Sequence, residues 1–344
     1  MDKLKATTID DVAREAGVSK STVSRALANS PRISEETRRR IVQIKDRLGY
    51  EPSNLARGLS LRRTYTVGVL LEDISNSFFT EVAKGIETTL KKAGYTMFLT
   101  STGFSCEEEI RLTRTFLSNG VDGILITPVD ENSEALSLLK AQGIPFFVLN
   151  NKPEDPAVNW VDTENIKGGY LAAKHLLELG HRKFFILRSV KLKGCRERFS
   201  GIEKALGEFG LSVSDQAVAG DANTRSDGYA LTRNFFEHSL KGSMPTAVIT
   251  TNDVVAIGAM EYFFEKGIRI PEDVSIIGYD DISLAGLIRV PLTTIHQPKF
   301  TMGEIAAYML INIIEGQARG LPHQYLLQPH LIVRESTKEL KRDQ

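Results

Sequence analysis

The chain contains very little cysteine. Two of its 344 residues, Cys106 and Cys195, are cysteines, with no CxxC motif and no histidine at metal-ligand spacing. This pattern argues against a zinc site or a disulfide framework and fits a protein of the reducing cytosol. The first residues, MDKLKATTIDD, lack the apolar segment of a secretory signal, and no run of about 18 apolar residues occurs. The sequence therefore predicts a cytoplasmic protein without a membrane segment.

Motifs of common enzyme classes are missing as well. The turn LLEDISNSFF, after the first strand-like run, has no glycine fingerprint and no phosphate-binding loop, which argues against a nucleotide cofactor. No G-x-S-x-G elbow occurs, the six histidines are scattered, and Cys195 has no histidine close in sequence. We therefore expect no catalysis, no cofactor and no metal site, and an inert thiol at Cys195.

Charge is balanced overall but unevenly distributed. The formal net charge is +0, yet residues 1–63 hold 14 Lys and Arg against 8 Asp and Glu, a net of +6. The other 281 residues hold 29 against 35, a net of −6. A small basic head on a larger acidic body indicates a polyanionic partner for the head alone. The length suits two or three domains.

The basic head has the pattern of three short helices. Thr8 is a good N-cap with Asp11 as its capping-box partner, and Gly17 ends the first helix. Ser19 and Ser34 begin the second and third helices. The outward residues of the second helix are Lys20, Ser21, Thr22, Ser24 and Arg25. Short hydroxyls and cations suit a helix that enters a major groove; the alternative is a bundle whose polar face is only solvated.

Longer motifs make the comparison more specific. TIDDVAREAGVSKSTVSRAL resembles the signature of the LacI/GalR family of bacterial transcription regulators, and GYEPSNLARGL resembles that family's hinge helix. Further segments follow in the family's order: DISNSFFTEVAKGIE, VDGILITP, HLLELGHRK, TAVITTNDVVAIGAM, IPEDVSIIGYDD and PLTTIHQP. The resemblance covers practically the whole chain. It implies a sequence-specific DNA-binding repressor of carbohydrate-utilisation genes, controlled by a sugar, sugar acid or sugar phosphate.

The resemblance also implies roles in DNA binding for residues of the head. Positions that reach base edges are Lys20, Ser21 and Arg25, and positions that hold phosphates are Ser19, Thr22 and Arg32. Arg25 matches a bidentate partner of guanine, worth about 1–3 kcal/mol of discrimination. The minor-groove positions of the hinge are Asn54, Ala56 and Leu59. Leu59 stands where a leucine wedges between base pairs; its alternative role is that of a plain linker residue.

From Thr66 onward, strand-like runs alternate with helical stretches in two series. This alternation predicts parallel sheets in two α/β lobes, with a ligand at the carboxyl ends of the strands. The predicted fold is an all-α helix-turn-helix head plus a two-lobed core resembling periplasmic binding proteins. We expect these parts: head 1–52, hinge and linker 53–65, first lobe 66–162 with about 293–322, second lobe 163–292 with about 323–337, and tail 338–344.

Candidate effector contacts lie at predicted strand ends. They are Phe78, Phe79, Asn150, Arg198, Asn252, Asp280 and Gln297. Carboxylate and guanidinium groups together suit the hydroxyls of a polyol, and the resemblance assigns effector hydrogen bonds to the positions of Arg198, Asn252, Asp280 and Gln297. The two phenylalanines either stack on a ring or belong to the core. Asp253 and Asp281 are better explained as structural caps.

One basic segment, RSVKLKGCRERF, follows the first strand of the second lobe. We hypothesise that Arg188 and Lys191, with Lys152, contact an anionic group on the effector; a solvated loop is the alternative. Many family members have a glycine-rich turn here and an aromatic residue near Ala222, and this chain has neither. The family's effector contacts are therefore in doubt in this segment.

The resemblance further implies a homodimer on a pseudo-palindromic operator. The C-terminal RESTKELKRDQ has no apolar heptads that would add a tetramerising coiled coil. Effector binding would shift the lobes and weaken DNA binding, typically by about 1–3 kcal/mol. The alternative function is a cytosolic sugar-binding or scaffold module whose head binds protein.

Overall fold

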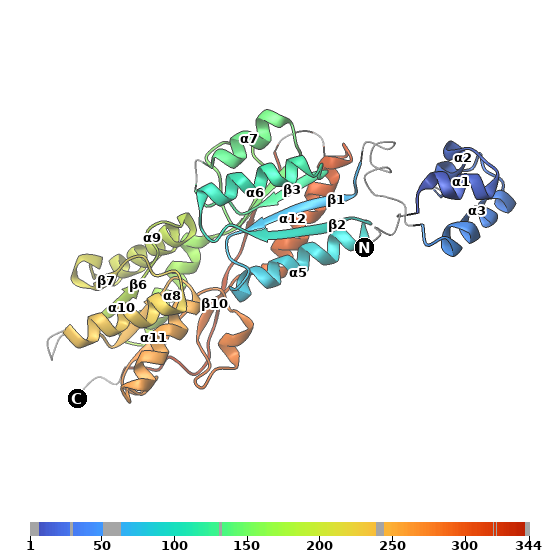
Figure 1. Cartoon of the computed structure of the whole chain (residues 1–344). Coiled ribbons are helices and arrows are strands. Elements are labelled where there is room, and N and C mark those ends of the chain that lie inside the picture. Colours follow the sequence, from blue (N-terminus) through green and yellow to red (C-terminus); the bar gives the residue numbers. More distant parts are fainter. Residues whose placement is uncertain are drawn as a thin grey trace. The chain divides into compact units, whose positions relative to one another are not determined.

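The structure is a computed structural model that describes residues 7–27, 30–50, 63–130, 133–238, 244–318, 320 and 322–340. The chain divides into two compact units, Met1–Thr64 and Tyr65–Gln344, which we call the head and the body (Figure 1). Within the described ranges, no helix combines the length and the apolar character needed to cross a membrane.

The head is the predicted set of three helices, α1 (Ile9–Ala16), α2 (Lys20–Leu27) and α3 (Glu35–Arg47). The capping box at Thr8 is confirmed, because the Asp11 carboxylate accepts from the Thr8 backbone N–H at 2.9 Å. Gly17 ends α1 in the left-handed region, with φ 63°. The buried core of the head consists of Val12, Ala13, Ala16, Val23, Ala26, Ile41 and Tyr50.

The first lobe of the body contains a parallel sheet of six strands in the order β11–β5–β4–β3–β1–β2. The strands are β1 (Thr66–Leu71), β2 (Thr96–Ser101), β3 (Gly123–Ile126), β4 (Phe146–Leu149), β5 (Trp160–Thr163) and β11 (Gln324–Leu327). The helices are α5 (Ser77–Lys92), α6 (Cys106–Ser118), α7 (Glu134–Gln142) and α12 (Lys299–Ile314). Figure 1 shows α5 and α12 on one face of the sheet and α6 and α7 on the other.

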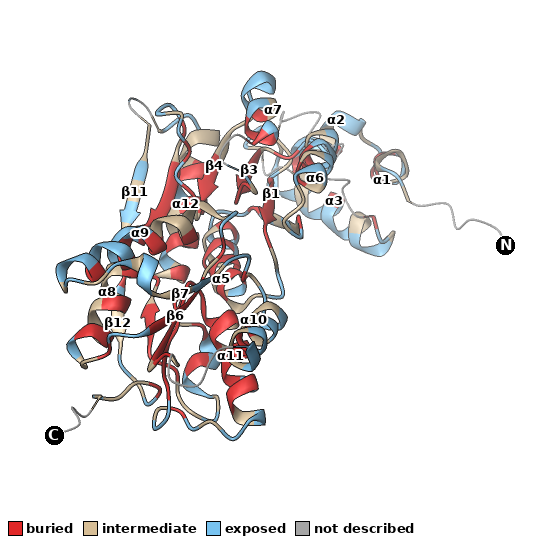
Figure 2. Ribbon diagram, turned by 90° about the vertical axis from the view of Figure 1, so that its left-hand side faces the viewer, coloured by how far each residue is buried: buried red, intermediate tan, exposed pale blue. Residues whose placement is uncertain are grey.

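Both faces of this sheet are covered by helices, and successive residues of a strand pack alternately against one face and the other. In β3, Leu125 packs into the cluster that includes α5 and α12, whereas Ile124 and Ile126 pack into the cluster that includes α6 and α7. Successive strand residues point to opposite faces, so a sheet covered on both faces needs continuous apolar runs. Figure 2 shows the buried strands between helices whose outer faces are exposed.

The second lobe contains a parallel sheet of four strands in the order β7–β6–β8–β9. The strands are β6 (Phe184–Leu187), β7 (Ala217–Ala219), β8 (Ala247–Thr250) and β9 (Ser275–Ile277). The helices are α8 (Asn165–Glu178), α9 (Lys193–Glu208), α10 (Arg225–His238), α11 (Asp253–Glu265) and the short 3-10 helices η1 (Val213–Asp215) and η2 (Ser283–Gly286). An antiparallel pair, β10 (Thr294–His296) and β12 (His330–Ile332), lies beside β9 through the bridges Ile277–Thr293 and Asp280–His296.

The predicted division of residues 293–337 between the lobes is wrong in detail. We expected 293–322 in the first lobe, but β10 bridges to the end of β9 in the second. We expected 323–337 in the second lobe, but β11 pairs with β5 in the first. The expected tail also begins too early, because the Leu340 backbone N–H donates to the Leu179 carbonyl at 2.8 Å. These strands are only three or four residues long and pair with distant segments, so local pattern does not reveal them.

Helix pairs in both lobes approach closely because both partners carry a glycine at the contact. A Cβ atom on Gly169 of α8 would overlap the carbonyl oxygen of Arg198 on α9, and one on Gly201 of α9 would overlap that of Ile166 on α8. The same reciprocal arrangement joins α5 to α12 and α10 to α11, at Gly85, Gly303, Gly228 and Gly258. The α8–α9 contact sets the position of Arg198.

Candidate functional site

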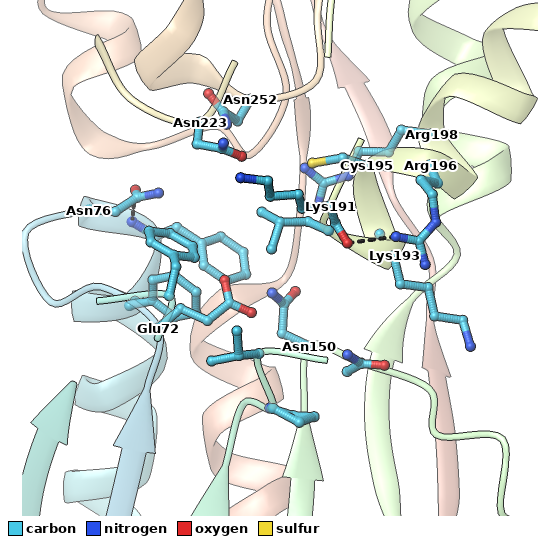
Figure 3. A pocket seen from close by; sticks show the side chains of 18 of the residues that line it. Glu72, Asn76, Asn150, Lys191, Lys193, Cys195, Arg196, Arg198, Asn223 and Asn252 are labelled. Atoms are coloured by element: carbon cyan, nitrogen blue, oxygen red, sulfur yellow. Dashed lines mark hydrogen bonds between the residues drawn. The ribbon is translucent and has the colours of Figure 1, made fainter. Parts of the chain in front are cut away.

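The two sheets of the body face each other across a cavity of about 280 Å³, close to the lower end of the range typical of ligand pockets, about 300 Å³. Its walls follow the carboxyl ends of the strands, as expected for doubly wound sheets. The polar lining residues from the first lobe are Glu72, Asn76, Asp130, Asn150 and Asn151. Those from the second lobe include Lys191, Lys193, Arg196, Arg198, Asn223, Asn252 and Asp280 (Figure 3).

Arg198 is the most fully engaged side chain of the cavity. It is 6% exposed, its Nε donates to Asn165 Oδ1 at 2.9 Å, and one Nη donates to the Thr251 carbonyl at 2.6 Å. The same Nη lies 3.5 Å from Asp280 Oδ1, and the guanidinium lies 3.8 Å from the centre of the Tyr279 ring. The guanidinium is therefore held rigidly at one wall of the cavity.

Asp280 and Gln297 form a pair of which only one member reaches the cavity. Gln297 is fully buried and donates through Nε2 to Asp280 Oδ1 at 2.7 Å, but it is not among the residues that line the cavity. Lys299, also buried, donates to the carbonyls of Asp280, at 2.7 Å, and Asp281, at 2.8 Å. The family resemblance implied a direct effector contact for Gln297, whereas the structure places Gln297 behind Asp280 as a support.

The first-lobe wall combines aromatic rings with a buried carboxyl group. Phe78 and Phe79 are each 3% exposed and pack edge to face at 5.0 Å, so they belong to the core and also line the cavity. Glu72 directly follows β1 and is 6% exposed. Within the described ranges, its carboxyl group has no hydrogen-bond or ion-pair partner. Sequence reasoning missed Glu72, although its place at a strand end was a usable signal.

Side-chain amides supply most of the remaining polar lining. Asn76 and Asn252 cap α5 and α11, because their Oδ1 atoms accept from the backbone N–H groups of Phe78, at 3.0 Å, and Val255, at 2.8 Å. Capping occupies the oxygen of each amide and leaves its NH₂ group for a ligand. The Oδ1 atoms of Asn151 and Asn223 are buried without a partner among the described residues. Of these amide residues, the sequence had pointed only to Asn252.

The cationic side chains that the sequence proposed as anion contacts lie in different environments. Lys191 lines the cavity, as hypothesised. The Arg188 guanidinium instead stacks 3.7 Å from the centre of the Phe199 ring, and the Lys152 ammonium lies 5.7 Å from the centre of the Trp160 ring. Neither Arg188 nor Lys152 belongs to the lining, so their assignment as anion contacts at this cavity is corrected. Packing against aromatic rings turns both cations away.

Asp253 and Asp281, which follow the cavity residues Asn252 and Asp280 in sequence, have structural roles, as the sequence suggested. Asp253 accepts from Thr294 Oγ1 at 2.5 Å and from the Ile282 backbone N–H at 2.9 Å. Asp281 pairs with Arg334 at 2.5 Å and His296 at 2.8 Å, and these hydrogen bonds outweigh burial and lower the pKa of Asp281 to about 2. No cluster of three or more metal-ligating side chains occurs among the residues described.

The predicted DNA-contacting residues in and beside the three helices are accessible at the surface of the head. Ser19, Lys20, Ser21, Arg25 and Arg32 are exposed, and Thr22 is half-buried. Ser19 Oγ contacts the hydroxyls of Ser21 at 2.8 Å and Thr22 at 2.9 Å. Lys20 pairs with Asp10 at 2.7 Å, an exposed ion pair of the kind that contributes little and can be exchanged for a phosphate. The hinge residues Asn54, Ala56 and Leu59 lie outside the described residues.

Burial gives the cavity an acid that is mostly neutral at pH 7. Burial raises the pKa of Glu72 from 4.5 to about 8, although the nearby Arg198 lowers it in part. Burial likewise raises the pKa of Asp162, at the end of β5, to about 7. Between pH 5 and 8 the unfolded chain releases the Glu72 proton while the folded chain keeps it, so this group makes the free energy of unfolding fall as pH rises.

Glu72→Gln is therefore expected to flatten the pH dependence of stability. At pH 8 the ligand-free variant should be more stable than the wild type by about 4 kcal/mol, since the pKa of Glu72 is about 8 in the folded chain against 4.5 in the unfolded chain and each pKa unit is worth about 1.4 kcal/mol. At pH 5 the two should be similar. Urea unfolding at both pH values measures the difference. Glu203→Gln, an exposed position on α9, is the control; an equal effect from both variants would contradict the assignment to Glu72.

Comparisons with known proteins agree with this architecture. Residues 8–53 match the family of bacterial regulatory proteins, lacI family, and residues 173–337 match the periplasmic binding protein-like domain. The chain is 34% identical over 339 residues to the HTH-type transcriptional repressor PurR of Photobacterium profundum, covering 97% of this chain and 99% of the relative.

Solved structures show the same fold. The Lac repressor dimer bound to operator and the anti-inducer ONPF has a TM-score of 0.85 and 26% identity, covering 97% of this chain and 100% of that one. A LacI family transcriptional regulator from Enterococcus faecium with bound ribose has a TM-score of 0.73 and 33% identity, covering 80% and 100%. The chain belongs to the lacI family of bacterial regulatory proteins and is a DNA-binding transcriptional repressor with a periplasmic-binding-protein-like domain for a small effector.

Proposed function

We propose that this repressor acts in the cytoplasm as a homodimer on a pseudo-palindromic operator, and that a small carbohydrate in the cavity relieves repression. The observation that carries the carbohydrate is the lining of the cavity. Carboxyl, guanidinium and amide groups from both lobes converge beside Phe78 and Phe79, and hydroxyl groups, which both donate and accept, need such a mixed lining. The similar regulator with bound ribose supports the same class.

Exposed apolar side chains on the body support the dimer. Phe98 and Leu99 on the edge strand β2 are 44% and 39% exposed, and Leu287, just after η2, is 80% exposed. Apolar surface of this kind is often covered by a partner, and the similar Lac repressor structure is a dimer on its operator. Two-fold symmetry would present two heads to the two halves of an operator.

The contacts at Lys299 suggest how the effector reaches the DNA. Lys299 begins α12 in the first lobe, and its ammonium binds carbonyls at the cavity end of the second lobe. The contact of Lys299 with the second lobe would act as a fixed point. An effector held between Asp280 and the first-lobe wall would rotate one lobe relative to the other about this point. Such a change would alter the relation between the two first lobes of a dimer and so the spacing of its heads.

Arg25→Ala tests DNA recognition. With an operator selected from random duplexes, the variant should lose about 1–3 kcal/mol of discrimination at one base pair, because a bidentate contact to guanine is removed. Fluorescence anisotropy on the selected operator and on single-base variants measures this loss. Arg14→Ala, which removes the same charge from an exposed side chain of α1, should leave base preference intact.

A loss of affinity that is uniform across sequences would mean that Arg25 contacts phosphate only. The wild-type affinity should also fall with salt, by a log–log slope of roughly 0.9 for each phosphate contacted. Binding that does not depend on salt would contradict an operator-binding head.

Thermal shift tests the effector class. A sugar present at 100 times its dissociation constant should stabilise the body by about 2.7 kcal/mol, because it binds only the folded state. The same sugar should weaken operator binding in the anisotropy assay. If a panel of sugars and sugar derivatives produces no shift, the carbohydrate effector is wrong, whatever the DNA result.

A further inference from the structure

Lys191 is the cation of the basic segment that remains available to a ligand. Figure 3 shows its side chain reaching into the cavity with the ammonium toward Asn223. Within the described ranges this ammonium makes no hydrogen bond and no ion pair. By contrast, Lys193 donates to the Lys152 carbonyl at 2.7 Å, and Arg196 donates to the Lys191 carbonyl at 2.5 Å. The neighbouring cations therefore hold the segment in place, and Lys191 faces the cavity.

The N-terminus of α9 opens into the same wall without a side-chain cap. This helix has 16 residues, and its N-cap position is Leu192, whose side chain cannot accept a hydrogen bond. The first residues of the helix, Lys193, Gly194 and Cys195, all line the cavity. Their backbone N–H groups have no intrahelical acceptor and carry the positive end of the helix dipole, which favours an anion.

Buried, unpartnered groups on the first-lobe wall show that the cavity is built for a polar ligand. The Glu72 carboxyl and the Asn151 Oδ1 both lack partners among the described residues, although Glu72 is only 6% exposed and Asn151 only 9%. Leaving such groups unpaired costs free energy that a ligand hydroxyl would recover. These two side chains lie on the wall opposite the second-lobe residues, so one ligand can contact both walls.

The charge of the lining favours an anionic ligand. Four cationic residues line the cavity, Lys191, Lys193, Arg196 and Arg198, against three acids, Glu72, Asp130 and Asp280. Burial raises the pKa of Glu72 to about 8, so at pH 7 this carboxyl is mostly protonated. It then donates a hydrogen bond and does not repel a negative charge. The cavity is thus net positive in its ligand-free state.

We infer that the effector is an anionic sugar, whose phosphate or carboxylate group binds Lys191 and the uncapped N-terminus of α9 while its hydroxyls face Glu72. This inference rests on the proposed carbohydrate effector and names its class. Phosphate and carboxylate share the required chemistry, an anion with several acceptor oxygens. The ring lies between Phe78 and Arg198, and the anion orients it toward the second lobe.

Isothermal titration calorimetry on the full-length protein tests the inference. The panel consists of pentoses and hexoses, the phosphate monoester of each and the corresponding aldonic acid, at pH 7. At least one charged compound should bind ten times more tightly than its neutral parent. Lys191→Gln should weaken that compound about tenfold, the equivalent of about 1.4 kcal/mol, and should change the neutral parent by less than twofold. Whether the phosphate or the carboxylate member binds identifies the anion.

Lys152→Gln is the matched control, because it removes the same charge from a nearby lysine outside the lining. It should leave every affinity unchanged. Equal binding of a charged compound and its neutral parent, or equal weakening by Lys191→Gln and Lys152→Gln, would overturn the anionic effector while leaving the carbohydrate effector in place. If no compound of the panel binds the wild type, both proposals fail.

Discussion

Arg198→Met is expected to abolish effector binding and to lower the free energy of unfolding by about 3–5 kcal/mol, the usual cost of removing one partner of a buried ion pair. The guanidinium is 6% exposed and donates to Asn165, at 2.9 Å, and to the Thr251 carbonyl, at 2.6 Å. Methionine fills part of the space but removes the hydrogen bonds to these acceptors and the positive charge beside the 4% exposed Asp280, which keeps the hydrogen bond from Gln297. Urea unfolding and calorimetry measure the two effects.

A second variant separates the loss of the ion pair from simple misfolding. Arg198→Met combined with Asp280→Asn removes both charges and should recover part of the lost stability, because no buried charge remains unpaired. The single variant should also be less damaged at low pH than at high pH, since burial raises the pKa of Asp280 and the loss of Arg198 removes a charge that lowers it. Lys204→Met, an exposed position on the same helix, should change stability by less than about 0.5 kcal/mol. Equal stability of wild type and Arg198→Met would contradict the role assigned to this network.

Local patterns predicted the elements whose determinants are local. The capping residues Thr8 and Ser34 begin α1 and α3 as expected, and the apolar runs of β1, β6 and β8 are strands. The start of α9 has no comparable local signal, because the Leu192 side chain cannot cap a helix and Gly194 weakens one. The pairing of the short strands β10, β11 and β12 has no local signal, since each pairs with a strand far away in sequence.

The same contrast holds for the site. Asn150 was predicted because the carboxyl ends of parallel strands meet at one edge, whereas Arg198, Asn252 and Asp280 were also assigned by the family resemblance. All four line the cavity. The side-chain directions of Arg188 and Lys152 could not be read from the sequence. They depend on the rings of Phe199 and Trp160 beside them. Residue type and strand position thus predict where a side chain begins, whereas packing decides which way it points.

Gly169→Ala is expected to destabilise the body by about 3 kcal/mol, in the upper range for overpacking a core. The added Cβ would overlap the carbonyl oxygen of Arg198, so α8 and α9 must separate. The backbone of Arg198 moves with α9, and its guanidinium moves relative to Asp280. Effector affinity should therefore fall by more than tenfold even though residue 169 is not part of the cavity lining.

Gly207→Ala on α9 is the matched control for this substitution. Its Cβ would have no neighbour within 4 Å and the position is exposed, so the better helix propensity of alanine should stabilise the protein by up to about 1 kcal/mol. Effector affinity should not change. If Gly169→Ala behaved like Gly207→Ala in urea unfolding and calorimetry, the close contact of α8 with α9 would not be what positions Arg198. If glycine-to-alanine substitution lowers the free energy of unfolding at residue 169 but raises it at residue 207, the backbone contact between α8 and α9 is what holds Arg198 in place.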